Sequence, residues 1–149
     1  MNCKSFLLIC ILSFFLSSCG KGSSSAAVAT TCSPTVTLSS SANSIYESAS
    51  GTITLTATAS CAPSQNILVS IASSGTATEG TDYGNVGTIG ISAGYTSGTA
   101  NFDPHDNDNS YENNETAILS ITAVSGSGAI ESGNQSVTIT INEYALNSG

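Results

Sequence analysis

The sequence is short of positive charge. Among its 149 residues only Lys4 and Lys21 are basic, while ten aspartate and glutamate residues bring the formal net charge to -8. A protein that binds nucleic acid places cations against the phosphates. A chain with no basic residue after position 21 therefore excludes nucleic acid as a partner. The acidic excess favours a small cation as the ligand instead.

The chain also has no tryptophan and a single histidine, His105. With a single histidine, a catalytic Ser–His–Asp or Cys–His set is implausible. The chain also has no arginine that could bind an oxyanion. Paired carboxylates are present, so the residue types alone do not exclude glycosidase activity. The acidic residues nevertheless lie in short loops with little aromatic surface to bind a sugar. We therefore expect that the protein is not an enzyme.

The first residues have the pattern of a bacterial lipoprotein signal. Lys4 precedes an apolar run over 6–16, which is shorter than the roughly 20 apolar residues that span a bilayer. The run ends in Leu-Ser-Ser-Cys at 16–19, which resembles the lipobox. This resemblance implies a signal peptide over 1–18, cleaved before Cys19, and lipid on Cys19 itself. The alternative is an ordinary signal peptide with a chance cysteine.

The residues that follow Cys19 are small and polar. The stretch 20–31 reads GKGSSSAAVATT and has no periodicity, so it is typical of a flexible tether. Twelve such residues reach about 20 Å on average. We therefore expect a lipidated tether over 19–31, a globular domain over 32–149, and a location on the bacterial envelope, at the outer membrane or the cell surface.

The domain has no amphipathic helical pattern. Short segments instead alternate apolar residues with serine or threonine between Gly/Ser/Asn-rich turns. Seven such segments occur, at 36–38, 53–57, 67–71, 89–91, 100–102, 117–121 and 137–141. Seven short strands in about 110 residues are typical of an immunoglobulin-like antiparallel β-sandwich. The predicted fold class is therefore all-β, a seven-stranded antiparallel sandwich.

Strand parity predicts which loops lie together. If each strand reverses the direction of the last, every second connection falls at the same end of the sandwich. Nine of the ten acidic residues then fall at one end, and only Glu131 falls at the other. Of the five cysteines, Cys3 and Cys10 lie in the predicted signal peptide and Cys19 is the predicted lipidation site. The other two, Cys32 and Cys61, fall at the end opposite the acidic residues. We predict that they form a disulfide, with two free buried thiols as the alternative.

A cluster of carboxylates repels itself. Two charges about 5 Å apart at an effective dielectric near 20 repel by roughly 3 kcal/mol. Either the loops separate in water or a cation holds them together. Ca²⁺ suits an all-oxygen site of irregular geometry, whereas transition metals favour histidine or cysteine. The alternative is a solvated set of acidic loops without an ion.

Five blocks of the sequence resemble the Calx-beta domain family. The segment 74–83, SGTATEGTDY, is similar to the most characteristic family signature. Four further blocks match in order and spacing, at 44–48, 91–97, 108–116 and 137–143. The resemblance covers roughly 36–143 and implies a seven-stranded sandwich, in which many family members bind Ca²⁺ in the loops at one end.

The resemblance also implies a set of calcium ligands. Carried over by motif, these are Glu47, Asp82, Asp106, Asp108, Glu112, Glu115 and Glu143. Asn107, Asn109 and Asn142 stand where strongly binding members often have aspartate, and fewer charges mean weaker binding. We therefore expect one or two Ca²⁺ ions and an affinity suited to extracellular calcium.

Two functions follow as hypotheses. The first is a lipid-anchored envelope protein with structural Ca²⁺ in its membrane-distal loops, which serves in surface interaction or adhesion with an unknown protein or glycan. The second is a metal-free structural envelope lipoprotein that forms a subunit of a larger complex. In both, the membrane is reached through the lipid anchor.

Overall fold

The computed structural model describes residues 32–47, 50–105 and 113–143. Each of the seven segments expected from alternation forms a strand, and two short strands are added. The bounds are β1 Thr35–Ser40, β2 Ser44–Tyr46, β3 Ile53–Ala59, β4 Ile67–Gly75, β5 Thr88–Ile91, β6 Ser97–Phe102, β7 Glu115–Ser125, β8 Ile130–Glu131 and β9 Ser136–Asn142. In the described part of the chain no helix is long and apolar enough to cross a membrane.

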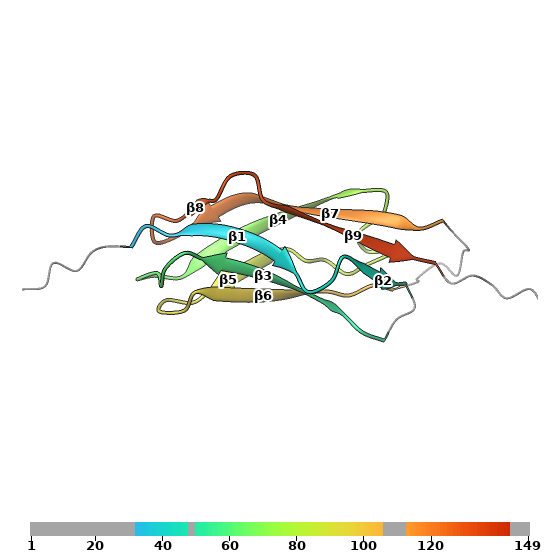
Figure 1. Ribbon diagram of the computed structural model, residues 1–149, viewed down its shortest axis with the longest axis horizontal. Helices are drawn as coiled ribbons and strands as arrows, with labels where there is room; N and C mark the ends of the chain where they lie inside the picture. The colour runs from blue at the N-terminus through green and yellow to red at the C-terminus, as the bar shows by residue number, and fades with distance from the viewer. Residues whose placement is uncertain (1–31, 48–49, 106–112, 144–149) are drawn as a thin grey trace, which may run out of the picture.

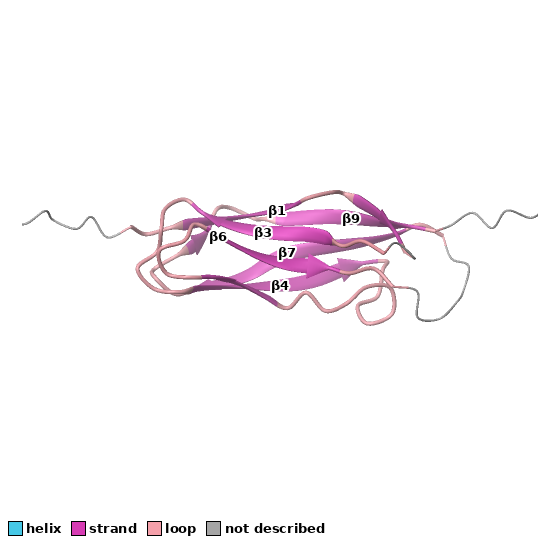
Figure 2. Ribbon diagram, turned by 90° about the horizontal axis from the view of Figure 1, so that it is seen from below, coloured by secondary structure: helices cyan, strands magenta, loops and turns pink. Residues whose placement is uncertain are grey.

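The strands form two sheets that pack face to face (Figures 1 and 2). One sheet has four strands in the order β6-β3-β1-β8, and the other has five in the order β2-β9-β7-β4-β5. Strands that follow one another along the chain repeatedly lie in different sheets. The fold is thus the predicted β-sandwich, and most of its strand pairs are antiparallel.

The predicted count of seven strands and the uniform antiparallel pairing were wrong in detail. The additional strands are β2, which pairs in parallel with β9, and β8, which pairs in parallel with β1. After β1, which contains the first predicted segment, the chain crosses from the four-stranded to the five-stranded sheet and forms β2 there. Because β2 and β8 have only three and two residues, they are too short to show a period of two.

Alternation along the strands builds the core. In β3 the side chains of Ile53, Leu55, Ala57 and Ala59 are buried, while the intervening threonines face outward. The other long strands alternate in the same way, and the apolar faces of the two sheets meet between the layers. The outward-facing positions of β3 and β1 are occupied by serine and threonine side chains rather than charged ones.

The two sheets come into backbone contact along one side, at β5 and β6. Gly98 of β6 packs against the backbone of Gly90 in β5, and a Cβ atom on Gly98 would clash with the carbonyl oxygen of Gly90. A Cβ on Gly90 itself would meet nothing within 4 Å. Glycine at position 98 is therefore required by backbone contact rather than by a turn.

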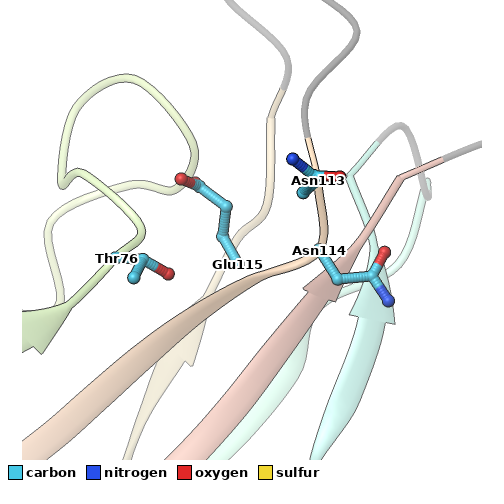
Figure 3. A pocket seen from close by; sticks show the side chains of 4 residues that line it. All are labelled: Thr76, Asn113, Asn114 and Glu115. Carbon is cyan, nitrogen blue, oxygen red and sulfur yellow. The ribbon is translucent and has the colours of Figure 1, made fainter.

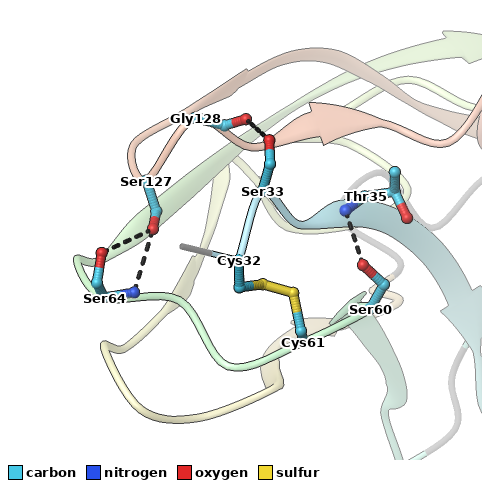
Figure 4. The surroundings of a disulfide bond; sticks show 8 residues. All are labelled: Cys32, Ser33, Thr35, Ser60, Cys61, Ser64, Ser127 and Gly128. Atoms are coloured by element: carbon cyan, nitrogen blue, oxygen red, sulfur yellow. Dashed lines mark hydrogen bonds between the residues drawn. A yellow bond between two sulfur atoms is a disulfide. The ribbon is translucent and has the colours of Figure 1, made fainter. Parts of the chain in front are cut away.

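One end of the sandwich contains the disulfide between Cys32 and Cys61, as predicted from strand parity (Figure 4). Their Cα atoms are 6.3 Å apart. We call the described loops at this end, residues 32–34, 60–66, 92–96 and 126–129, the cysteine end. Hydrogen bonds connect these loops, from the Ser64 amide to Ser127 Oγ at 3.1 Å and from the Gly94 amide to the Pro63 carbonyl at 2.9 Å.

Candidate functional site

The opposite end carries the described acidic loops. We call residues 47, 76–87, 103–105, 113–114 and 143 the acidic end. Hydrogen bonds link these segments across the sequence: the Gly84 amide donates to the Asp103 carbonyl, and the Glu143 amide donates to Asn114 Oδ1. The structure therefore confirms that connections far apart in the chain meet at one end, as parity predicted.

Asp82 is a buried carboxylate in the loop over 76–87. Only 4% of its surface is exposed. Its Oδ2 atom accepts a hydrogen bond from the Thr78 amide, and its own amide donates to the Thr78 carbonyl at 2.9 Å. Its carbonyl accepts from the His105 amide at 3.0 Å, which joins this loop to the start of the β6–β7 connection. Asp82 thus closes a tight turn and fixes the position of its own carboxylate.

Tyr83, the next residue, anchors the loop in the core. It is 1% exposed and its ring stacks on Phe102. Isolated β-bridges connect it to Glu79 and to Pro104, so it lies between two acidic segments. Burial raises the pKa of Tyr83 above 10.0, and the nearby charges of Glu79 and Asp82 add to this rise, whereas a hydrogen bond with Ser73 opposes it.

Glu79 uses both of its carboxylate oxygens within the protein. Ser73 Oγ donates to Oε2 at 2.8 Å, and the Asn85 side-chain amide donates to Oε1. These bonds tie the start of the loop to β4 and to the loop's far side. Glu79 is exposed, yet its contacts indicate that it positions the loop containing Asp82.

Three other predicted ligands lie at the ends of neighbouring strands of the five-stranded sheet. Glu47 follows β2, is 8% exposed, and donates its amide to the Asn142 carbonyl at 3.1 Å. Glu115 begins β7 and pairs with Ile141 in β9. Glu143 follows β9 and is partly buried. The strand order β2-β9-β7 therefore places these three residues at one edge of the acidic end.

A pocket of about 390 Å³ opens between β4 and β7 at this end, lined by Thr76, Asn113, Asn114 and Glu115. Figure 3 shows Glu115 pointing toward the loop that follows β4, while Asn114 points to the other side of its strand. The Thr116 amide donates to Thr76 Oγ1 at 2.9 Å, and the amides of Thr76 and Ala77 both donate to the Thr116 carbonyl. Every residue that lines the pocket has a side-chain oxygen.

The described residues do not bring the predicted ligands together into one cluster. Among residues 32–47, 50–105 and 113–143, no three His, Cys, Asp or Glu side chains are close enough to hold a metal ion. Glu47, Asp82, Glu115 and Glu143 share an end of the molecule without forming such a group. The other three predicted ligands lie outside the described residues, as does the predicted lipidation site Cys19; these ligands are Asp106, Asp108 and Glu112.

Sequence reasoning missed the pocket's neutral oxygen donors. Thr76, Asn113 and Asn114 were not predicted as site residues, although they adjoin predicted ligands. Their amide and hydroxyl oxygens are of the kind that Ca²⁺ accepts. The run Asn113-Asn114-Glu115 was the available signal, since it presents three oxygen-bearing side chains beside the start of a strand.

Known proteins resemble this chain in structure. No protein-family model and no curated protein matches the sequence. The solved structure of the apo-form Calx CBD1 domain matches with a TM-score of 0.59 at 18% identity, over 74% of this chain and 99% of that domain. CBD12 from CALX1.2 and the calcium binding domain CBD12 of CALX1.1 match with TM-scores of 0.56 and 0.54 at 20% identity.

The CALX1.2 and CALX1.1 structures are longer than this chain. Each match covers 67% of this chain, which spans 41% and 40% of the CALX1.2 and CALX1.1 chains. The described sandwich therefore has the Calx-beta fold, as the five sequence blocks indicated. The likeness, at 18–20% identity, is one of fold.

The donor chemistry of the acidic end fits a hard cation. Its side chains offer carboxylate, amide and hydroxyl oxygens, and its one histidine, His105, is placed by a backbone bond to Asp82 and a 3.4 Å contact with the Gly80 carbonyl. Oxygen donors without a thiolate or an imidazole cluster suit Ca²⁺ rather than Zn²⁺ or Cu²⁺. A six- to eight-oxygen shell needs more donors than the described carboxylates bring together.

Proposed function

We propose that the acidic end binds Ca²⁺ and that the protein is a non-catalytic interaction module anchored to the bacterial envelope by lipid on Cys19. The observation that carries the calcium proposal is the convergence of Glu47, Asp82, Glu115 and Glu143 on one end of a fold shared with a domain described as calcium binding. Asp106, Asp108 and Glu112 would complete the ligand set.

The proposed role of Ca²⁺ is structural. Asp82 and Glu115 come from different connections, and their like charges oppose a compact arrangement of these loops. A bound divalent cation would offset that repulsion and stiffen the loops that face away from the membrane. A surface protein or glycan is the partner that such loops would meet.

Calcium binding is tested by thermal unfolding in Ca²⁺ and in EDTA, with calorimetric titration of Ca²⁺. The expected result is a higher melting temperature in Ca²⁺, because a ligand of the folded state adds about 2.7 kcal/mol at a hundred times its Kd. Equal melting temperatures together with no calorimetric signal would overturn the proposal.

Two variants locate the ion. Glu115→Gln preserves the shape of a predicted ligand and removes its charge, so it is expected to weaken Ca²⁺ binding. The matched control is Glu131→Gln, which lies outside the acidic end and whose carboxylate accepts a bond from the Gln135 amide. Equal Ca²⁺ affinities in the two variants would place the ion elsewhere.

A metal-free structural subunit of a larger envelope complex is the second proposed function. The observation that favours it is that carboxylates of the acidic end accept hydrogen bonds from the protein itself, Glu79 from Ser73 and Asn85, and Asp82 from the Thr78 amide. Lipid on Cys19 is common to both functions. Mass spectrometry of protein purified from bacterial membranes would detect it as a chain that begins at Cys19 and carries the mass of the acyl chains.

A further inference from the structure

The four loops of the cysteine end have no charged residue, and the one described acidic residue beside them is Glu131, in β8. These loops, 32–34, 60–66, 92–96 and 126–129, contain only small, hydroxyl, amide and apolar side chains. The acidic end, by contrast, carries every described Asp and Glu except Glu131 and Glu115, and Glu115 lines the pocket there. The sandwich is therefore polarised along its length, with a neutral end and a negative end.

Exposed apolar side chains collect at or beside the neutral end. Tyr95, in the loop 92–96, is 70% exposed, which is the largest fraction among the large hydrophobic side chains that the structure describes. Ile130, directly after the loop 126–129, is 61% exposed, and Leu68, at the start of β4, is 53% exposed. In Figure 1 the turn before β6, the start of β4 and β8 lie at the same end as the start of β1.

This surface is held in place by internal bonds. The Ala93 amide donates to Asn66 Oδ1 at 2.9 Å, and the Tyr95 amide donates to the Ser92 carbonyl at 3.0 Å. The Cys32–Cys61 disulfide fixes the point where the chain enters the sandwich. Tyr95 is thus presented on a braced turn next to the entry of the N-terminal segment.

We infer that the cysteine end rests on the lipid bilayer and inserts Tyr95 at the interface between headgroups and acyl chains. This inference rests on the proposed lipid anchor. The tether of residues 20–31 reaches about 20 Å and joins the domain at Cys32, so a lipid on Cys19 would hold this end against the membrane.

The chemistry of the surface agrees with a bilayer as its partner. Tyrosine favours the membrane interface because its ring is apolar and its hydroxyl stays in contact with water. Loops without charged side chains approach the bilayer without the cost of desolvating an ion. Anionic lipids would repel the acidic end, so electrostatics orient the long axis of the domain away from the surface.

The test uses a tryptophan as a depth probe, because the natural chain has none. The chain from residue 19 onward is coupled through the Cys19 thiol to a maleimide phospholipid, with the native disulfide intact. It is placed on vesicles of phosphatidylethanolamine and phosphatidylglycerol that contain bromine-labelled acyl chains. Tyr95→Trp reports on the cysteine end, and Tyr46→Trp is the matched control.

Tyr46 is a suitable control because it is also an exposed tyrosine, at 49%, and it adjoins Glu47 of the acidic end. The expected result is a shift of the Tyr95→Trp emission to shorter wavelength and its quenching by the brominated chains, with neither change in Tyr46→Trp. Equal emission and quenching of the two variants on vesicle-bound protein would overturn the inference.

A failure of the membrane contact can be distinguished from a failure of the proposed lipid anchor. Coupling at Cys19 supplies the anchor chemically, so the probe measures orientation even if the natural chain carries no lipid. Absence of natural lipid is read from the mass spectrum of membrane-purified protein and overturns the anchor. Vesicle-bound protein with an unquenched Tyr95→Trp overturns only the membrane contact.

Discussion

Tyr83 stacks on Phe102 with their ring centroids 4.7 Å apart and their planes inclined by 23°. Both side chains are almost completely buried, although Tyr83 belongs to a loop and Phe102 ends a strand. The pair therefore joins the loop that contains Asp82 to the core of the sandwich. It makes the geometry of the acidic end depend on core packing.

Removal of the Phe102 ring is expected to be strongly destabilising. Phe102→Ala should lower the free energy of unfolding by about 3–5 kcal/mol, because it opens a cavity beneath Tyr83 and removes the stacked partner. Urea denaturation measures the change. Thr99→Ala, at an exposed position of the same strand, is the control and should change stability by about 0.5 kcal/mol or less. A loss from Phe102→Ala no larger than the control's would contradict the packing described.

Alkaline pH is expected to destabilise the fold through Tyr83. Burial raises the pKa of Tyr83 in the folded state above 10.0, so the folded chain holds the phenolic proton more tightly than the unfolded chain. The resulting stability is complete below pH 10 and declines as the pH rises through the folded-state pKa.

Tyr83→Phe tests this linkage. The variant should lose about 1 kcal/mol near neutral pH, with the hydrogen bond to Ser73, and should show a shallower loss of stability above pH 10. Tyr95→Phe, at an exposed position, should leave the alkaline decline as it is in the natural protein. Parallel pH profiles for the natural chain and Tyr83→Phe would mean that another group is responsible.

Gly98 and Gly90 are expected to respond differently to a single methyl group. Gly98→Ala would press a Cβ into the Gly90 carbonyl and force β5 and β6 apart, at a cost of about 1–3 kcal/mol. Gly90→Ala meets open space and should be nearly neutral or slightly stabilising. Chemical denaturation of the two variants gives the comparison, and similar midpoints would show that the sheets do not touch at this side.

Loss of the disulfide is expected to cost about 3–4 kcal/mol, since the bond closes a loop with a sequence separation of 29. Cys32→Ala and Cys61→Ala should each show this loss, and the double variant should lose little more than either single one. Reductant should destabilise the natural chain and leave the double variant unchanged. Two reactive thiols at these positions in denatured, unreduced protein would disprove the bond.

The elements that local alternation encodes were predictable from the sequence. Each of the seven alternating segments became a strand because a period of two buries one face whatever the strand's partner is. By contrast, β2 and β8 exist only through parallel pairing with β9 and β1, and nothing local distinguishes two or three such residues from a loop. Their sheet membership depends on where distant strands lie.

The candidate site likewise has one part that the sequence predicted and one part that it did not. Parity along the chain predicted that Glu47, Asp82, Glu115 and Glu143 share one end, and hydrogen bonds between their segments agree. The oxygen-lined pocket at Thr76 was not predictable, because its walls come from two connections whose approach is set by the pairing of β4 with β7.

The sequence by itself determined the class of the fold and the sorting of acids and cysteines to opposite ends. These follow from residue types and from their order, which folding does not change. Only the tertiary structure decided that Tyr83 lies on Phe102, that Gly98 lies against Gly90, and that Asp82 closes its own turn. The stacked rings come from a loop and a strand, and the paired glycines come from consecutive strands that belong to different sheets. All three contacts depend on backbone geometry that residue order does not specify.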